Sequence, residues 1–292
     1  MRFPKTVALI AAVAVLMSPP VRATDATLDA LMAEYWDHYL ARYPVAATRI
    51  GVDIFNDRFG SVTPTAIAAH QDTERAFAGR LEDIDRESLS AEGRVNASIL
   101  DWVLEDSISA GELELYRIPF NTFAGFYMNA LTAANGVRME TADDYRDYLA
   151  RLEDLPRYFS ENLENMRRGA ESNFVLPAVV IEGVLPTLRS QLKEKPEDSS
   201  LYDPFRSIDN RIDEDTATEL AAAARRIIAE DVLPAFESLV SFLEEEYPAS
   251  SSIGASELDG GKEYYEFQIR RYTTLTDIDA DEIHEIGLAE VA

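Results

Sequence analysis

Apolar residues recur at steps of three and four along much of this sequence, which is the spacing of side chains on one face of an α-helix. The longest stripe follows Thr141, which with Asp144 three residues later forms the capping-box pattern of a helix start. Pro156 lies inside the stripe and predicts a kink or a restart, and Gly169 predicts the end. The apolar positions are Tyr145, Tyr148, Leu149, Leu152, Leu155, Phe159, Leu163 and Met166.

A second stripe predicts another long helix, which starts at Thr216 with Glu219 completing a capping box. Pro234 should bend this helix, and Pro248 with the serines that follow should end it. Its apolar positions are Leu220, Ala223, Ala224, Ile227, Ile228, Val232, Phe236, Leu239, Val240, Leu243 and Tyr247.

The same spacing predicts shorter helices at residues 25–42, 64–84, 88–109 and 177–194. Segment 119–128 is aromatic-rich and irregular, and we expect it to bury Phe120, Phe123 and Phe126 under a loop. No run of strict alternation is long enough to demand a large sheet. The sequence therefore predicts a mainly α class, an irregular multi-helix domain with few or no strands.

The first residues fit a secretory signal peptide. Arg2 and Lys5 give a positive start, and an apolar run over 7–17 follows. A membrane-spanning helix would need about 20 apolar residues, so the run is too short to serve as an anchor. We expect residues 1–23 to be removed after Ala23, which leaves no membrane anchor. Because the chain has no Cys for lipid attachment, the predicted location is periplasmic or secreted.

Residues 24–292 are then expected to form one helical domain. With 47% apolar residues the chain can bury a sizeable core, and the absence of Cys excludes disulfides and thiolate zinc sites. The chain has 53 acidic and 27 basic residues, for a net charge of −26. Such a surface repels phosphate groups, so nucleic acid is excluded as a partner.

The metal motifs fail at positions that set their geometry. His284 and Glu285 open like the H-E-x-x-H helix of zinc peptidases, but Leu288 occupies the second His position. The aspartates around Asp279 resemble a calcium loop that lacks the required Gly and final Glu. Asp279 and Glu282 fit a helix cap better. The sequence assigns no catalytic and no metal residue, and leaves a site from three scattered histidines as an alternative.

The segment 260–274, GGKEYYEFQIRRYTT, carries the substrate-binding candidates Tyr264, Tyr265 and Arg270. Phenols and a guanidinium can hold a substrate carboxylate or carbonyl. The alternative, which the spacing favours, is a helix whose arginines pair with local acids. Its inward face would consist of Tyr265, Ile269 and Tyr272.

Seven segments, taken in order, resemble one bacterial family. They read PVAATRIG at 44–51, IPFN at 118–121 leading to Gly125, TADDYRDYLARLEDLP at 141–156, VLPAVVIEGV at 175–184, SLYDPF at 200–205, GGKEYYEFQIRRYTT at 260–274 and IHEIGLAEV at 283–291. Their order and spacing resemble the bacterial domain-of-unknown-function family 885 (DUF885). The resemblance extends over nearly all of the expected mature chain.

The resemblance implies an exported, helical, zincin-like protein about twice as long as this chain, regarded as a zinc metallopeptidase or related hydrolase. The family's zinc-binding helix lies in its C-terminal half, and no position here matches it. The resemblance therefore implies zinc for the full-length protein, a peptide or small-molecule substrate, and no cofactor in this chain. The last residues resemble the middle of a family helix, so we expect an N-terminal portion that is inactive alone.

Two functions follow from these observations. The first is the N-terminal half of an exported DUF885-like zinc metallopeptidase or hydrolase, whose metal site is absent from this chain. The alternative is a complete, non-catalytic helical binding or adaptor protein of the periplasm. A third function, a serine hydrolase, would rest on the S-x-x-K pattern of Ser190 and Lys193. The K-T-G sequence that should accompany this pattern does not follow it.

Overall fold

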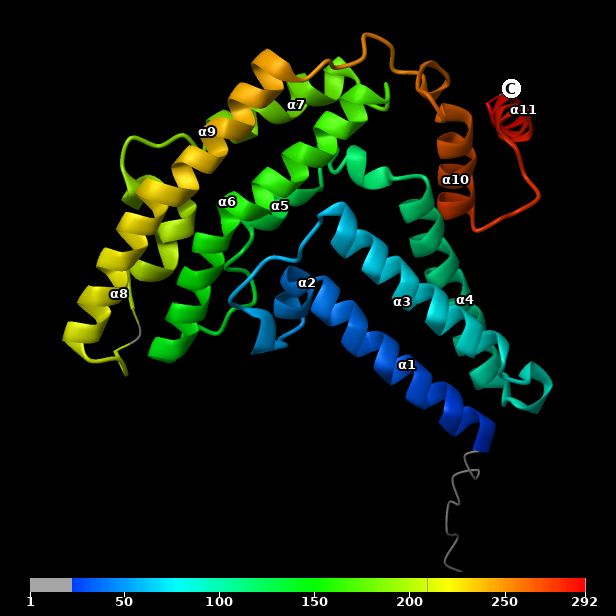
Figure 1. Ribbon diagram of the computed structural model, residues 1–292, viewed down its shortest axis with the longest axis horizontal. Helices are drawn as coiled ribbons and strands as arrows, with labels where there is room; N and C mark the ends of the chain where they lie inside the picture. Colours follow the sequence, from blue (N-terminus) through cyan, green and yellow to red (C-terminus); the bar gives the residue numbers. More distant parts are fainter. Residues whose placement is uncertain (1–22, 209, 292) are drawn as a thin grey trace, which may run out of the picture.

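The computed structural model describes residues 23–208 and 210–291, and in this part of the chain the architecture is helical throughout, without a named β-strand (Figure 1). The predicted mainly α class is confirmed. The α-helices are α1 (Ala23–Arg42), α2 (Pro44–Arg49), α3 (Pro64–Glu82), α4 (Ala91–Glu112), α5 (Phe126–Leu131), α6 (Ala142–Glu171), α7 (Ala178–Arg189), α8 (Glu214–Ile227), α9 (Leu233–Ser241), α10 (Gly261–Thr273) and α11 (Ala280–Glu290).

The predicted signal peptide, apart from Ala23, lies outside the described residues. Within the described residues, none of the helices combines the length and the apolar character that a membrane crossing requires.

The long helix α6 organises the larger core. The Thr141 hydroxyl accepts a hydrogen bond from the Asp144 backbone N–H (3.3 Å), and the Asp144 carboxylate accepts one from the Thr141 N–H (2.7 Å), which confirms the capping box. All eight residues of the predicted stripe are buried. The helix continues through Pro156 and ends at Glu171, so the restart is wrong, and the end lies two residues after Gly169.

The second long helix starts earlier than predicted. The Asp213 carboxylate accepts a hydrogen bond from the Thr216 N–H (2.9 Å), so Asp213 is the cap and the predicted start at Thr216 is wrong. A π-turn, Ile228–Val232, separates α8 from α9, and Pro234 lies in the first turn of α9. The wider turn accommodates the proline, which has no N–H and whose ring would clash within a regular helix.

The helices form two arms (Figure 1). In one arm, α6 packs with α5, α7, α8 and α9 around a large aromatic and aliphatic core. In the other, α1, α3 and α4 enclose a smaller core that includes Leu28, Leu81 and Leu104. The cavities described below are formed along the junction between these arms.

Segment 119–128 deviates from the prediction at one residue. Phe120 and Phe126 are buried, but Phe123 is 88% exposed. The Asn121 side-chain oxygen accepts hydrogen bonds from the backbone N–H groups of Phe123 (2.8 Å) and Ala124 (2.9 Å). This tight turn places Phe123 at its tip, so the prediction of burial was wrong there.

Arg151 of α6 is completely buried and was not identified from the sequence. Its guanidinium donates hydrogen bonds to the Thr48 hydroxyl (2.6 Å) and to three backbone carbonyls, those of Phe55 (2.7 Å), Ala133 (2.9 Å) and Arg58 (3.2 Å). Burial lowers the pKa of Arg151 to about 10, which still leaves it charged at neutral pH. The side chain therefore fixes the segment after α2 against α6.

Candidate functional site

The segment 260–274 forms a turn followed by helix α10. Gly260 has φ +76°, in the left-handed region that favours glycine. At Gly261 a Cβ atom would lie only 1.6 Å from the Ala255 carbonyl oxygen, so a larger residue cannot fit without moving the backbone. The two glycines therefore set the direction in which α10 leaves the preceding loop.

The three predicted substrate-binding residues lie on different faces of α10. Tyr264 is half-buried and packs edge-to-face on Phe174, with ring centroids 5.6 Å apart. Tyr265 is 48% exposed. The guanidinium of Arg270 pairs with the Glu105 carboxylate of α4 at 2.5 Å. The structure does not bring the three side chains together into one pocket.

The alternative interpretation of this helix is partly confirmed. Both arginines pair with acids, although these are on α4 and not nearby in sequence: Arg271 pairs with Asp106 at 2.9 Å. Ile269 is buried as expected, but Tyr265 and Tyr272 are exposed, so the predicted inward face is wrong for both tyrosines. Phe267 is buried in their place, because the face that meets α4 carries Phe267 and the arginine side chains.

A groove of about 790 Å³ lies beside α10, and we call it the α10 groove. Its walls come from three separate segments, 118–125, 175–180 and 252–258, together with α10. The lining is mostly apolar, with polar groups along α10. Representative lining residues are Phe120, Leu176, Ile253, Tyr264, Arg271 and Tyr272.

A tight backbone approach forms one wall of the α10 groove. Phe120 and Gly125 form an isolated antiparallel bridge around the Asn121 turn. Gly125 has φ +135°, and a Cβ there would lie 2.3 Å from Cβ of Phe120. Only glycine can occupy this position without displacing Phe120. Gly125 is one of the residues on which the family resemblance rests. The close approach of its backbone to Phe120 explains why this position requires glycine.

The described residues that line the α10 groove include no carboxylate, although acids outnumber bases two to one in the chain. Arg271 is a cation within the lining, and burial raises the pKa of the Tyr264 phenol, which therefore stays a neutral hydrogen-bond donor. The neighbouring depression on the other side of α10 is lined by Arg270, Glu105, Glu263, Glu266 and Asp277. Arg270 thus lies among several acids, whereas Arg271 pairs with Asp106 of α4 and otherwise meets a groove lining without carboxylates.

No three His, Asp or Glu side chains among the described residues are grouped so that they could hold a metal ion. His38 and His70 do meet, with ring centroids 5.3 Å apart, across α1 and α3. His284 lies exposed on α11. The described residues therefore do not fit the zinc site that the resemblance implies for the full-length protein.

The S-x-x-K pattern has no catalytic geometry. The Ser190 hydroxyl donates a hydrogen bond to the Thr187 carbonyl (2.7 Å) and accepts one from the Gln191 side chain (2.9 Å). Both contacts belong to the polar end of α7. Neither supplies a base that could activate the hydroxyl as a nucleophile.

Comparisons with known proteins agree with the fold and the segments above. The family model described as "Bacterial protein of unknown function (DUF885)" matches residues 44–292. The crystal structure of "the putative lipoprotein from Colwellia psychrerythraea" is similar at a TM-score of 0.80 and 17% identity. The alignment covers 93% of this chain and 49% of that one, so this chain spans about half its length. No curated protein matches. This chain belongs to the DUF885 family.

Proposed function

We propose that this chain is the N-terminal half of an exported DUF885 hydrolase, and that the α10 groove is a wall of its substrate channel. The observation that carries the proposal is the convergence of three segments. The stretches 118–125, 175–184 and 260–274, which lie up to about 140 residues apart, all contribute to the groove. Loops and helix ends that meet at one depression are where binding sites are concentrated in helical folds.

The groove suits an extended, mainly apolar peptide segment or a small molecule of similar character. Its apolar walls would hold side chains, while Tyr264, Gln268 and Arg271 offer donors to carbonyl oxygens. Arg271 pairs with Asp106 through one nitrogen, and a guanidinium has further N–H groups that can contact a ligand. The missing carboxylates favour a substrate with exposed carbonyl or carboxylate oxygens.

Bond cleavage is assigned to residues outside this chain. The described residues offer no grouped ligands for a metal, so no step of this proposal passes through zinc within the chain. What this chain contributes is binding and orientation. The similarity over 49% of the Colwellia chain supports a longer protein, whose remaining half would complete the channel.

The surface of α11 also supports a longer assembly. None of its residues is buried, yet Ile286 and Leu288, together with Val291 just after the helix, expose large apolar side chains. Figure 1 shows α11 at the edge of the molecule, beyond α10. In the full-length protein we expect these side chains to pack against the second half.

The test uses neighbouring residues of α10 as matched pairs. Binding of a labelled mixture of casein peptides is measured by fluorescence anisotropy for Arg271→Gln and for Arg270→Gln. We expect Arg271→Gln to weaken binding about tenfold, the effect of one charge-assisted hydrogen bond, while Arg270→Gln stays within about twofold. Of the second pair, Tyr264→Ala should weaken peptide binding, and Tyr265→Ala should leave it nearly unchanged. Equal effects within each pair would contradict the α10 groove as the binding wall.

Activity measurements separate the two functions. The full-length protein should hydrolyse the peptides, and this chain alone should not. Chelator-sensitive hydrolysis by this chain alone would overturn the assignment of the metal to the missing half. Peptide binding by this chain, combined with no hydrolysis by the longest natural form, would instead support the binding or adaptor alternative.

A further inference from the structure

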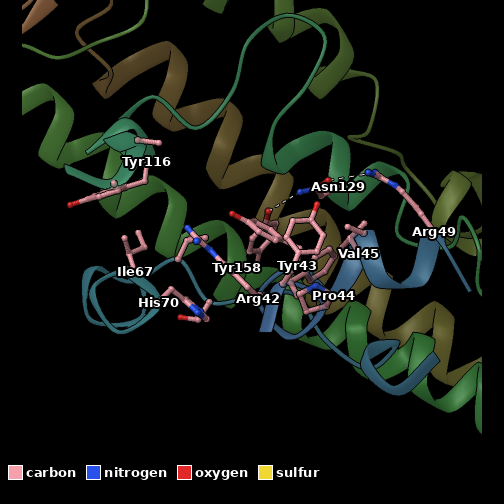
Figure 2. Close-up of a pocket in the computed structure, with 18 residues that line it drawn as sticks. Arg42, Tyr43, Pro44, Val45, Arg49, Ile67, His70, Tyr116, Asn129 and Tyr158 are labelled. Atoms are coloured by element: carbon pink, nitrogen blue, oxygen red, sulfur yellow. Dashed lines mark hydrogen bonds between the residues drawn. The ribbon is translucent and has the colours of Figure 1, made fainter. Parts of the chain in front are cut away.

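A second cavity, which shares Tyr43 with the α10 groove, lies where the end of α1, α2 and the loop after it meet α3, α4, α5 and α6 (Figure 2). It encloses about 300 Å³, and we call it the α2 cavity. Its body is apolar and aromatic. The rings of Phe59 and Tyr158 stack in parallel, with centroids 4.7 Å apart, and Val45 and Pro44 complete this side.

The charged side chains that line the α2 cavity are of one sign. Arg42 and Arg49 both line it, and no carboxylate belongs to the described lining. In a chain with 53 acids and 27 bases this arrangement is the reverse of the average surface. Since field lines concentrate in a cavity with low-dielectric walls, two guanidinium groups there favour an anion.

Two residues outside the cavity lining, Glu74 and Ser107, hold the Arg42 side chain in place. Arg42 pairs with Glu74, a carboxylate that is almost completely buried, and the same nitrogen, Nη1, donates to the Ser107 hydroxyl at 3.1 Å. A guanidinium has five N–H donors, so the others remain for a ligand. Glu74 offsets much of the charge of Arg42, which therefore acts chiefly as an oriented donor.

Arg49 supplies the uncompensated charge. It donates to the Thr132 hydroxyl (2.6 Å) and lies 3.5 Å from the Asn129 side-chain oxygen, both of which are neutral groups. Among the described residues it has no carboxylate within ion-pair distance, unlike most arginines of this chain. Asn129 in turn donates to the Tyr158 hydroxyl at 3.2 Å, and Figure 2 shows Arg49, Asn129 and Tyr158 in this order.

Tyr158 adds a neutral donor at the inner end of this series. Burial raises the pKa of the Tyr158 phenol, so the hydroxyl keeps its proton. Because that oxygen accepts the hydrogen bond from Asn129, its own proton is available to a ligand oxygen. Arg42 and Tyr158, together with the exposed Arg49, therefore present donors to one cavity with apolar walls.

We infer that the α2 cavity binds a small carboxylate with an apolar side chain, of the size of an N-acylated amino acid. A guanidinium matches the planar, two-oxygen geometry of a carboxylate, and the Phe59 and Tyr158 side would receive the apolar part. The volume of about 300 Å³ is at the lower end of small-molecule pockets, which excludes a long peptide. This site goes beyond the proposed function and does not depend on it.

Calorimetric titration of this chain with N-acetyl-L-leucine and with its neutral amide tests the inference. We expect the carboxylate to bind with a Kd of about 1 mM or tighter, and at least about tenfold more tightly than the amide. Arg49→Gln should reduce this preference to about threefold or less. Arg146→Gln, an exposed arginine of α6 that pairs with Asp143, should leave it unchanged.

Two further variants and a second anion test the inference more sharply. Arg49→Lys should retain part of the preference, because it keeps the charge and loses the planar fork. Arg271→Gln should leave carboxylate binding unaltered, so failure of the proposed substrate wall would not affect this result. Equal affinity for acid and amide, equal affinity for inorganic phosphate, or no binding at about 10 mM ligand would each overturn the inference.

Discussion

Helices α6 and α11 begin with the same local signal and have opposite surroundings. Both start with a capping box, formed by Thr141 and Asp144 in α6 and by Asp279 and Glu282 in α11. Thirteen of the thirty residues of α6 are buried, whereas none of the residues of α11 is. A local cap therefore specifies where a helix starts, but only packing against other elements makes that helix part of the stable core.

The largest expected effect concerns the buried charge of α6. Arg151→Met removes the donors to the Thr48 hydroxyl and three backbone carbonyls, so we expect a loss of about 3 kcal/mol in unfolding free energy. Arg146→Met, on the exposed side of the same helix, should cost less than about 1 kcal/mol. Urea unfolding monitored by circular dichroism measures both. Equal losses would mean that burial does not distinguish the two sites.

The next test compares the two caps directly. Thr141→Ala should lower the unfolding free energy by about 1 kcal/mol, because α6 is part of the cooperative core. Asp279→Ala should change it by less than about 0.3 kcal/mol and instead speed amide hydrogen exchange within α11 only. Urea unfolding and hydrogen exchange read by mass spectrometry give the two quantities. A global loss on removing the α11 cap would show that α11 packs more firmly than its exposure indicates.

The last test concerns His70, a half-buried residue whose exposure lies between that of the α6 core and that of α11. Burial, followed by the nearby Arg42 and His38, lowers the pKa of His70 from 6.5 to about 4. In this interval the unfolded chain binds more protons than the folded chain. The stability from neutral His70 is therefore fully present above pH 6.5 and is lost as the pH falls toward 4.

Because His70 is partly exposed, we expect this term to reach only about 1 kcal/mol after solvent screening. Between pH 7 and pH 5, wild-type protein should lose more stability in urea than His70→Gln does. His284→Gln, which alters an exposed histidine of α11, should follow the wild type. If His70→Gln has the same pH dependence as the wild type, His70 is not the titrating group.

The sequence predicted the helices well where a periodic stripe and a cap act together. The stripe of α6 is buried at every predicted position, and both the Thr141 and Asp279 caps form. The start at Thr216 failed because the Asp213 carboxylate, three residues earlier, accepts the Thr216 N–H and so begins the helix sooner. Phe123 failed because burial was inferred from aromatic composition, while the Asn121 turn decides its direction.

The sequence predicted which segment lines the candidate site, but not which of its side chains face the groove. Residues 260–274 do form a wall of the α10 groove, yet the groove takes Tyr264 with Arg271 and Tyr272. Tyr265 and Arg270 lie on other faces, because the contact of α10 with α4 fixes the rotation of the helix. Whether the predicted trio binds substrate remains a prediction, which the paired variants of α10 test. Arg271 was quoted with Arg270, and no sequence signal separated them.

The sequence by itself determined the helical class, most helix boundaries and the resemblance to DUF885, because these depend on residues a few positions apart. Only the tertiary structure decided which polar groups became enclosed. Arg151 reaches Thr48, 103 residues earlier, and Arg42 reaches Glu74 on another helix. The two acid-free cavities likewise combine distant segments. No local periodicity encodes such contacts, because the free energy that orders them comes from packing together elements that are far apart in the sequence.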